Sequence, residues 1–178
     1  MRKISCLALL LVGMAMTGFA QGGRVRAASK PDMNGTWKVN VAQSDFGEAP
    51  PPIRQNEVVK QAGDEFAIEI TLEREQGKQH YTLRFQVGGG EMPLAKGSFA
   101  DDAPFRVLSV KGEWQGPVLV VTEKVSFQGE EGTLKASYSL SGDRKVLRKA
   151  THVSMSAGEF DTKTVYDKEY GVRPGTTD

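Results

Sequence analysis

The sequence is poor in the side chains that most enzymes and metal sites use. Its single cysteine, Cys6, lies in the N-terminal apolar segment, so a chain that loses this segment has no thiol nucleophile, no thiolate ligand and no disulfide. The two histidines, His80 and His152, fall outside the H-x-H and H-E-x-x-H patterns of metal sites, and no G-x-S-x-G motif provides a nucleophilic serine. The sequence therefore predicts no catalytic residues, no metal and no cofactor, and an enzyme is the least favoured interpretation.

An excess of charge of one sign is also missing. The chain has 23 basic and 22 acidic side chains, and loss of residues 1–20 would remove Arg2 and Lys3 and leave 21 basic side chains against 22 acidic ones. A chain this balanced has no electrostatic basis for binding nucleic acid or an anionic membrane surface. We therefore expect neither as a partner.

Residues 1–20 have the three-part form of a secretory signal peptide. Arg2 and Lys3 precede an apolar run over residues 4–12, and small residues follow up to Ala20. The apolar run is too short to cross a hydrocarbon core of ~30 Å as a permanent helix. We expect cleavage after Ala20 and export to the periplasm or the cell exterior, with no integral membrane segment in the mature chain.

The rest of the chain is predicted to form one domain. Residues 21–33 have no periodicity and are rich in small and basic residues, which favours a flexible tether. Residues 171–178 are predicted to be a frayed tail. Between them, residues 34–170 contain no linker and no repeat of fixed period, so we predict a single β domain there.

Apolar and polar residues alternate with a period of two through most of this domain, and no long helical pattern interrupts them. The strands predicted from this alternation are 34–40, 56–61, 65–74, 79–87, 105–114, 118–128, 132–141, 144–155 and 159–169. The longest predicted loop is 90–104.

Four turns are predicted to join these strands as hairpins, at Gln76-Gly77, Gln115–Val118, Glu130-Glu131 and Ala157-Gly158. Pairing outward from the turns places opposite each other Phe66 and Val87, Trp114 and Leu119, Phe127 and Leu134, and Met155 and Phe160. The same registers place His80 opposite Glu73, and His152 opposite Lys163. Both histidines are thus predicted to be surface residues of different hairpins.

A sheet of sequential antiparallel strands with one apolar face buries that face and removes its edges by rolling up. We therefore predict an all-β protein, an antiparallel meander of eight to nine strands closed as a lipocalin-like up-and-down barrel or a strongly curved half-barrel. A flat sandwich is the alternative.

The start of the domain carries two resemblances. Residues 34–47 are similar to the G-T-W-K-x-N-x-x-x-S-x-F-G opening of a group of uncharacterised secreted bacterial proteins. Gly35-Thr36-Trp37 also resembles the G-x-W that opens the first strand of lipocalins, in which the tryptophan closes one end of the barrel and stacks under an arginine from the last strands. This resemblance implies that Trp37 closes the barrel here, with Arg148 as its partner.

Aromatic residues at inward positions are the candidate ligand contacts. They are Trp37, Phe66, Tyr81, Phe85, Trp114, Phe127 and Tyr138. In a wide barrel they would line a pocket for a small hydrophobic ligand, and in a narrow barrel they would pack on one another. The sequence favours a non-catalytic interaction or structural module of the envelope or the cell exterior, with an envelope protein as a partner. The alternative is a lipocalin-like binder of a small hydrophobic molecule in the barrel interior.

Overall fold

The computed structural model describes residues 30–170 except positions 48, 76, 96 and 100–102. The predicted signal peptide with its cleavage site, residues 21–29 of the predicted tether and the predicted tail lie outside the described residues. In the described part, strands form one antiparallel sheet: β1 Gly35–Val39, β2 Arg54–Ala62, β3 Glu65–Arg74, β4 Gly77–Gln86, β5 Met92–Pro93, β6 Phe105–Gln115, β7 Val118–Phe127, β8 Glu130–Leu140, β9 Val146–Met155 and β10 Gly158–Glu169. A short 3₁₀ helix, η1 Val41–Gln43, follows β1.

The predicted all-β antiparallel meander is confirmed, with ten strands in place of eight or nine. The additional strand is β5, a two-residue strand within the predicted loop 90–104. Among the described residues no helix has both the length and the apolar character that crossing a membrane requires.

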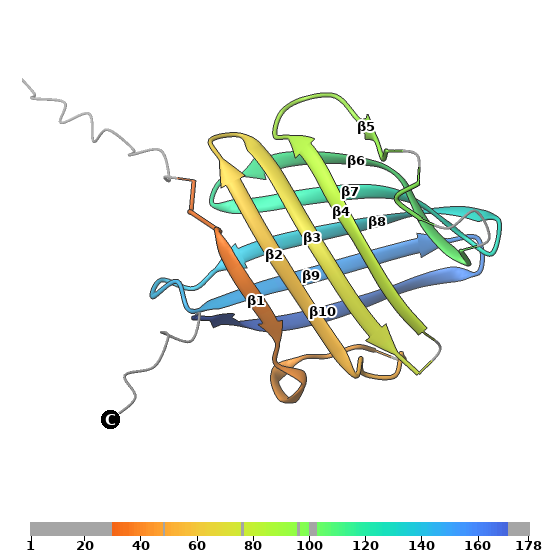
Figure 1. Ribbon diagram of the computed structural model, residues 1–178, viewed down its shortest axis with the longest axis horizontal. Helices are drawn as coiled ribbons and strands as arrows, with labels where there is room; N and C mark the ends of the chain where they lie inside the picture. The colour runs from red at the N-terminus through yellow and green to blue at the C-terminus, as the bar shows by residue number, and fades with distance from the viewer. Residues whose placement is uncertain (1–29, 48, 76, 96, 100–102, 171–178) are drawn as a thin grey trace, which may run out of the picture.

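Strand β1 closes the sheet, because it pairs with β2 along one edge and with β10 along the other. The order of strands is β4-β3-β2-β1-β10-β9-β8-β7-β6-β5. At the free ends of this order, β4 leads into the bridge between Val87 and Gly112 of β6, where the Gly88 amide donates to the Gly112 carbonyl at 2.9 Å. Figure 1 shows the resulting nearly closed barrel, in which β1–β4 cross over the strands β6–β10 behind them.

Gly112 allows β4 and β6 to approach at this seam. A Cβ atom on Gly112 would lie 2.3 Å from the ring of Phe85, so only glycine fits beneath that ring. The Phe85 ring stacks on Phe66 with centroids 5.5 Å apart, and Trp114 packs edge-on against Phe66 at 6.0 Å. These aromatic rings fill the interior beside the seam.

Inward-facing apolar side chains of both layers form the core, as the period of two predicts. The buried members are Met33, Trp37, Val59, Phe66, Ile68, Ile70, Tyr81, Leu83, Phe85, Val107, Val110, Leu119, Val121, Val125, Ala136, Tyr138, Leu147 and Tyr166. Their removal from water is the main stabilising contribution to the fold.

Three of the four predicted hairpin registers are wrong, although each strand keeps its predicted inward face. The observed partners are Phe85 for Phe66, Glu130 for Phe127 and Gly158 for Met155. The Trp114–Leu119 pair is confirmed. In each wrong hairpin the turn lies one or two residues earlier than predicted, which moves the partners by two or four positions.

Turn geometry explains the difference in the β7–β8 hairpin. Gln128 and Gly129 have φ angles of 53° and 90°, as the two central residues of a tight hairpin turn require. A shift by an even number of residues leaves every side chain on its face, so the apolar pattern does not distinguish the two registers.

Trp37 is fully buried, and its Nε1 donates to the Met33 carbonyl at 3.0 Å. The prediction that Arg148 is the cationic partner of Trp37 is wrong. Lys168 lies opposite Trp37 in the β1–β10 register, with its Nζ 5.1 Å from the centre of the ring, whereas Arg148 is exposed. Met33 is also buried in the core, which corrects its predicted place in the flexible tether 21–33.

We predict that Trp37→Ala lowers the free energy of unfolding by about 3–5 kcal/mol, because it leaves a cavity and removes the indole from Met33 and Lys168. Urea unfolding followed by circular dichroism measures this loss. The control is Phe160→Ala, which removes an exposed aromatic ring from β10. Equal losses in the two variants would contradict the structural role of Trp37.

Candidate functional site

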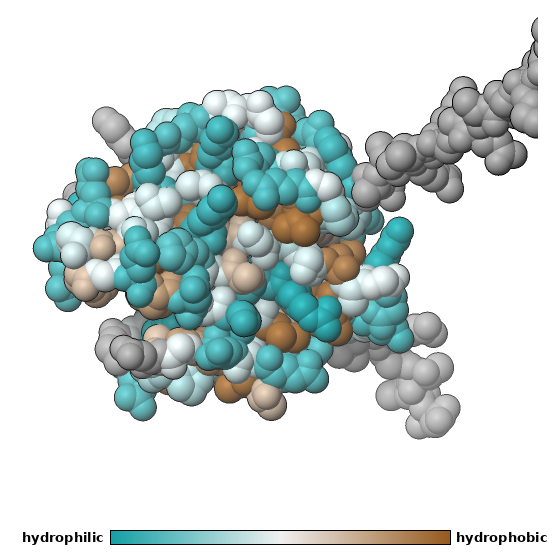
Figure 2. All heavy atoms as spheres, turned by 180° about the vertical axis from the view of Figure 1, so that it is seen from behind, coloured by the Kyte–Doolittle hydropathy of each residue, from teal (hydrophilic) through white to brown (hydrophobic). Residues whose placement is uncertain are grey.

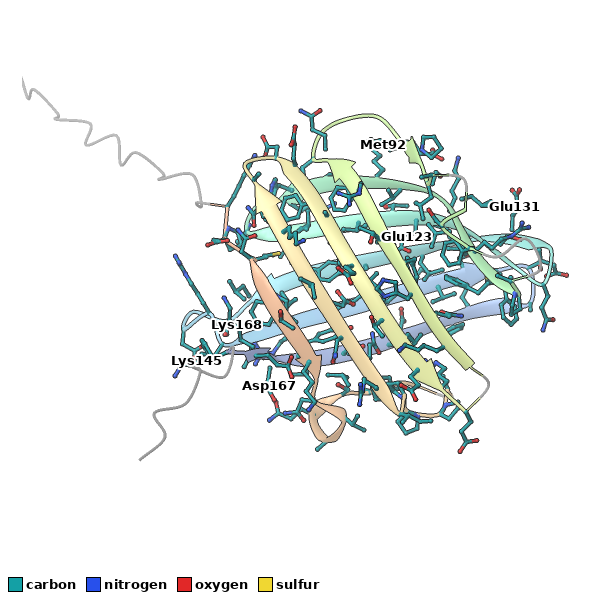
Figure 3. The ribbon with its side chains drawn as sticks, in the orientation of Figure 1. Met92, Glu123, Glu131, Lys145, Asp167 and Lys168 are labelled. Atoms are coloured by element: carbon teal, nitrogen blue, oxygen red, sulfur yellow. The ribbon has the colours of Figure 1, made fainter. Side chains whose placement is uncertain are left out.

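Three charged side chains lie at inward positions of the barrel strands. On β7, Glu123 continues the alternate series of Leu119 and Val121, and it is 2% exposed. Glu57 on β2 is 0% exposed, and the side chain of Lys149 on β9 is 11% exposed. In Figure 3, Glu123 is labelled among the strands seen behind β1–β4.

Glu57 is the centre of a buried hydrogen-bond network. Its Oε1 accepts from Lys149 Nζ at 2.9 Å and from the Tyr166 hydroxyl at 2.7 Å, and Gln55 Nε2 donates to that hydroxyl at 2.5 Å. Lys149 Nζ also lies 5.1 Å from the centre of the Tyr138 ring. The ion pair is therefore held from four strands, β2, β8, β9 and β10.

Not every buried oxygen of this cluster has a partner. Among the described residues, no donor lies in hydrogen-bond geometry to Oε2 of Glu57 or to Oε2 of Glu123. The Tyr138 hydroxyl faces the Glu57 carboxylate, which helps to raise the pKa of Tyr138, but it too lies outside that geometry. Roughly 90% or more of buried polar groups in proteins are hydrogen-bonded, and one left without a partner costs about 1–3 kcal/mol. The cluster can therefore accept further hydrogen bonds.

Burial sets the protonation of these groups. It raises the pKa of Glu123 to about 7; the Lys149 ammonium acts to lower this pKa and the Glu57 carboxylate to raise it. Burial alone would lower the pKa of Lys149, but attraction to Glu57 above all raises it above its usual value. Burial also raises the pKa of Tyr138 and Tyr166, which are neutral phenols. Glu123 is thus the group of this cluster that titrates near neutral pH.

Most of the predicted pocket residues lie in the interior. The buried ones are Trp37, Phe66, Tyr81, Phe85 and Tyr138. Trp114 is half-buried beside Phe66. Phe127 is 47% exposed, which corrects its predicted inward position: it ends β7 at the turn into β8, where it pairs with Glu130. A role of the other six as ligand contacts stays a prediction.

Glu57, Glu123 and Lys149 are not among the site residues predicted from the sequence. The signal was present, because the alternation that turns Val121 and Val125 inward also turns Glu123 inward. A charged residue within an inward apolar series is the pattern that marks such a position.

His80 is a surface residue of the β3–β4 hairpin. Its Nδ1 lies 3.0 Å from the Thr71 hydroxyl and its Nε2 lies 3.6 Å from Glu69. The predicted position opposite Glu73 is wrong, since Thr71 is the residue opposite.

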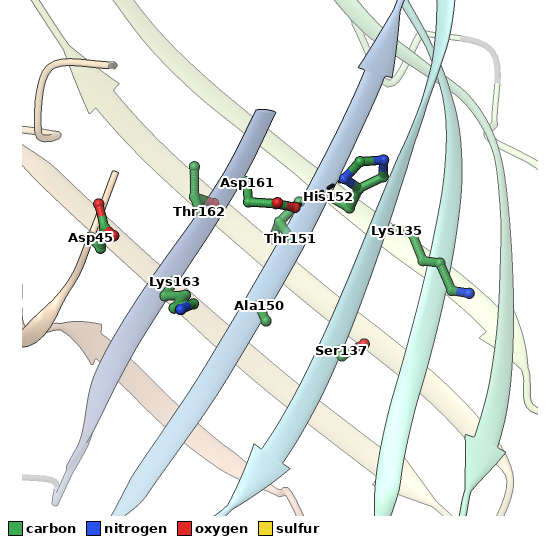
Figure 4. Close-up of a pocket in the computed structure, with 9 residues that line it drawn as sticks. All are labelled: Asp45, Lys135, Ser137, Ala150, Thr151, His152, Asp161, Thr162 and Lys163. Atoms are coloured by element: carbon green, nitrogen blue, oxygen red, sulfur yellow. Dashed lines mark hydrogen bonds and ion pairs between the residues drawn. The ribbon is translucent and has the colours of Figure 1, made fainter. Parts of the chain in front are cut away.

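His152 is on the outer face of β9, with Nδ1 2.9 Å from Asp161 of β10 rather than opposite Lys163 as predicted. It lines an open hollow of about 330 Å³ over β8–β10, shown in Figure 4, together with Asp45, Lys135, Ser137, Ala150, Thr151, Asp161, Thr162 and Lys163. In the described part of the chain, no group of three or more His, Cys, Asp or Glu side chains is arranged to hold a metal ion.

Comparison with known proteins gives similarities of fold. No protein-family model and no curated protein sequence matches the chain. Two solved structures that resemble it are zebrafish ileal bile acid-binding protein in complex with cholic acid and human cRBP IV. Both are 17% identical to this chain in sequence. The match to the bile acid-binding protein has a TM-score of 0.48 and covers 76% of this chain and 98% of that protein. The match to cRBP IV has a TM-score of 0.46 and covers 78% of this chain and 99% of that protein. Similarity of this size concerns the arrangement of strands and not what the barrel does.

We predict that Glu123 makes stability depend on pH. An unfolded glutamate releases its proton near pH 4.5, whereas folded Glu123 keeps it up to about pH 7. The folded state therefore binds the extra proton between these values, and stability falls as the pH rises through this window and stays level above it. The separation corresponds to about 3 kcal/mol.

Glu123→Gln removes this dependence, because the amide stays neutral at every pH. Urea unfolding gives the free energy of unfolding of the variant minus that of the parent. This difference should be about 3 kcal/mol more favourable to the variant at pH 8 than at pH 4. Glu131→Gln, at an exposed position of β8 labelled in Figure 3, should follow the parent at both pH values. The prediction would be contradicted if the free energies of unfolding of the parent and of Glu123→Gln differed by the same amount at pH 4 and at pH 8.

Proposed function

We propose that this protein binds a small amphiphilic molecule inside its barrel, with the polar end of the molecule at Glu57, Glu123 and Lys149. The observation that carries the proposal is the buried Glu123 carboxyl group, whose Oε2 has no partner among the described residues, beside a buried ion pair. A core that served only stability would gain from apolar side chains at these positions, because desolvating an ion pair often costs more than its attraction returns.

Perturbed carboxyl groups in an enclosed apolar setting are typical of functional sites. N–H or O–H groups of a ligand would donate hydrogen bonds to the Oε2 atoms of Glu57 and Glu123. These bonds would offset the cost of burying the two carboxyl groups. The same cluster also has the few convergent polar groups that orient a ligand in a mostly apolar site.

The remainder of the interior favours an apolar body for the ligand. Uncharged aromatic surface is provided by the stacked rings of Phe66 and Phe85 and by the ring of Tyr81. The Tyr81 ring packs on Phe99 with the ring centres 5.1 Å apart. In this structure the interior side chains pack on one another, so a bound molecule has to displace some of them.

The seam between β4 and β6 is where the barrel opens at the lowest cost. All other neighbouring long strands are joined by antiparallel ladders of several residue pairs, whereas here the described backbone link is the Val87–Gly112 bridge with the Gly88 amide. Separating β4 from β6 therefore breaks the fewest hydrogen bonds, and the local free energy of opening is lowest there.

We favour this function over an interaction module because the exposed apolar side chains are dispersed. The large ones in the described part are Val41, Ile53, Met92, Phe127, Phe160 and Tyr170. They come from separate segments, and in Figure 2 the hydrophobic residues of the visible face lie as spots between hydrophilic ones. A docking surface for an envelope protein calls for a contiguous patch. The signal-peptide pattern of residues 1–20 supports binding outside the cytoplasm.

The experiment is native mass spectrometry of the protein purified from its own envelope fraction. We predict a noncovalent adduct of one small molecule per chain, which is lost on denaturation. After extraction of that molecule, the neutral fluorescent probe N-phenyl-1-naphthylamine should bind saturably to the same site.

A matched pair of variants locates the binding. Ala136→Leu adds volume to the interior and should weaken probe binding about tenfold, as about 1.4 kcal/mol of overpacking implies. Ser137→Leu adds the same side chain at the next position, which faces outward on β8, and should bind like the parent. Absence of both an adduct and saturable probe binding, or equal effects of the two variants, would contradict the proposed function.

A further inference from the structure

The charges inside the barrel do not balance when both buried glutamates are ionised. Of the acidic side chains that the structure describes, Glu57 and Glu123 are the buried ones. Lys149 forms an ion pair with Glu57, and its charge also acts on Glu123. With both carboxyl groups ionised, the interior carries one negative charge more than it has positive charges. An uncompensated charge in a low-dielectric interior is strongly unfavourable, so an ionised cluster requires one further cation.

The hydrogen-bonding capacity of the cluster shows the same excess of acceptors. Lys149 and Tyr166 both donate to Oε1 of Glu57, and Gln55 donates to Tyr166. The Oε2 atoms of Glu57 and Glu123 remain without donors among the described residues. A group with several N–H donors fits these oxygens, whereas a carboxylate or phosphate would bring more acceptors and more negative charge.

We infer that the polar end of the ligand is an ammonium group that binds between Glu57 and Glu123, so that the barrel selects amphiphilic amines over amphiphilic acids. The inference rests on the proposed function and deepens it by naming the ligand class. An ammonium supplies both missing features, three donors and one positive charge. The Tyr138 ring, which already faces Lys149 Nζ at 5.1 Å, adds an aromatic face beside the cation site.

Proton release accompanies this binding. The titratable groups that face Glu123 are Lys149, Glu57, Tyr81 and Tyr138. Burial above all raises the pKa of Glu123 to about 7, with Lys149 acting to lower it and Glu57 to raise it. At pH 6 the empty site therefore carries a proton on Glu123, and an incoming ammonium replaces it. Affinity for an amine should rise between pH 6 and pH 8 and then level off, because above pH 7 no proton has to leave.

The test compares decylamine, decanol and decanoate, which share one alkyl chain and differ in the head group. We expect isothermal titration calorimetry of the purified full chain at pH 8 to give an affinity for decylamine at least about tenfold higher than for decanoate, with decanol between them. Glu123→Gln should lower the affinity for decylamine about tenfold and leave decanol unchanged. Glu131→Gln should behave like the parent for all three.

A second measurement does not depend on a variant. Titration of the parent with decylamine at pH 6, in buffers of different ionisation enthalpy, should show release of about one proton per bound amine, and less at pH 8. Equal affinities for the three molecules, tighter binding of decanoate, or no proton release at pH 6 would each overturn the ammonium assignment while the proposed function stands. Saturable binding of none of the three, with no binding of N-phenyl-1-naphthylamine, would overturn both.

Discussion

Strand β1 is hydrogen-bonded along both edges, and this double pairing joins the two layers into a barrel. Without it, β2 and β10 would each present an open edge and the apolar face would stay in water. With it, β2 lies one strand away from β10, and Glu57 contacts Lys149 and Tyr166 although 92 and 109 residues separate them along the chain. The charged cluster exists because the barrel closes.

The interior combines two opposed contributions to stability. Its aromatic and aliphatic side chains stabilise the barrel through burial, and this part needs no disulfide in a domain of this size. Glu57, Glu123 and Lys149 act against it, because each charge loses its hydration and Oε2 of both glutamates gains no described partner. Perturbed buried groups of this kind cluster at functional sites, and a ligand of the proposed kind would offset the cost that the folded chain alone carries.

The wrong registers and the missed site have different origins. The alternation in β7 already turned Val121, Glu123 and Val125 to one face, so the inward position of Glu123 was predictable from the sequence. The partner of Phe127 was not, because the same faces result when the β7–β8 turn moves from Glu130-Glu131 to Gln128-Gly129. The alternation alone also fails at Phe127. This residue is an even number of positions from the inward-facing Val125, but it lies at the end of its strand and is exposed.

The all-β class, the meander and the face on which most side chains lie follow from the alternation in the sequence, because a period of two is a local property of an extended backbone. The sequence also identified Trp37 as a buried residue at the opening of the first strand. The tertiary structure alone decided that Lys168 rather than Arg148 covers Trp37, and that Glu57 meets Lys149. These contacts join strands that are distant in the chain, and their register is set by the closure of β1 onto β10 and by turn conformations that no local pattern of apolar residues records.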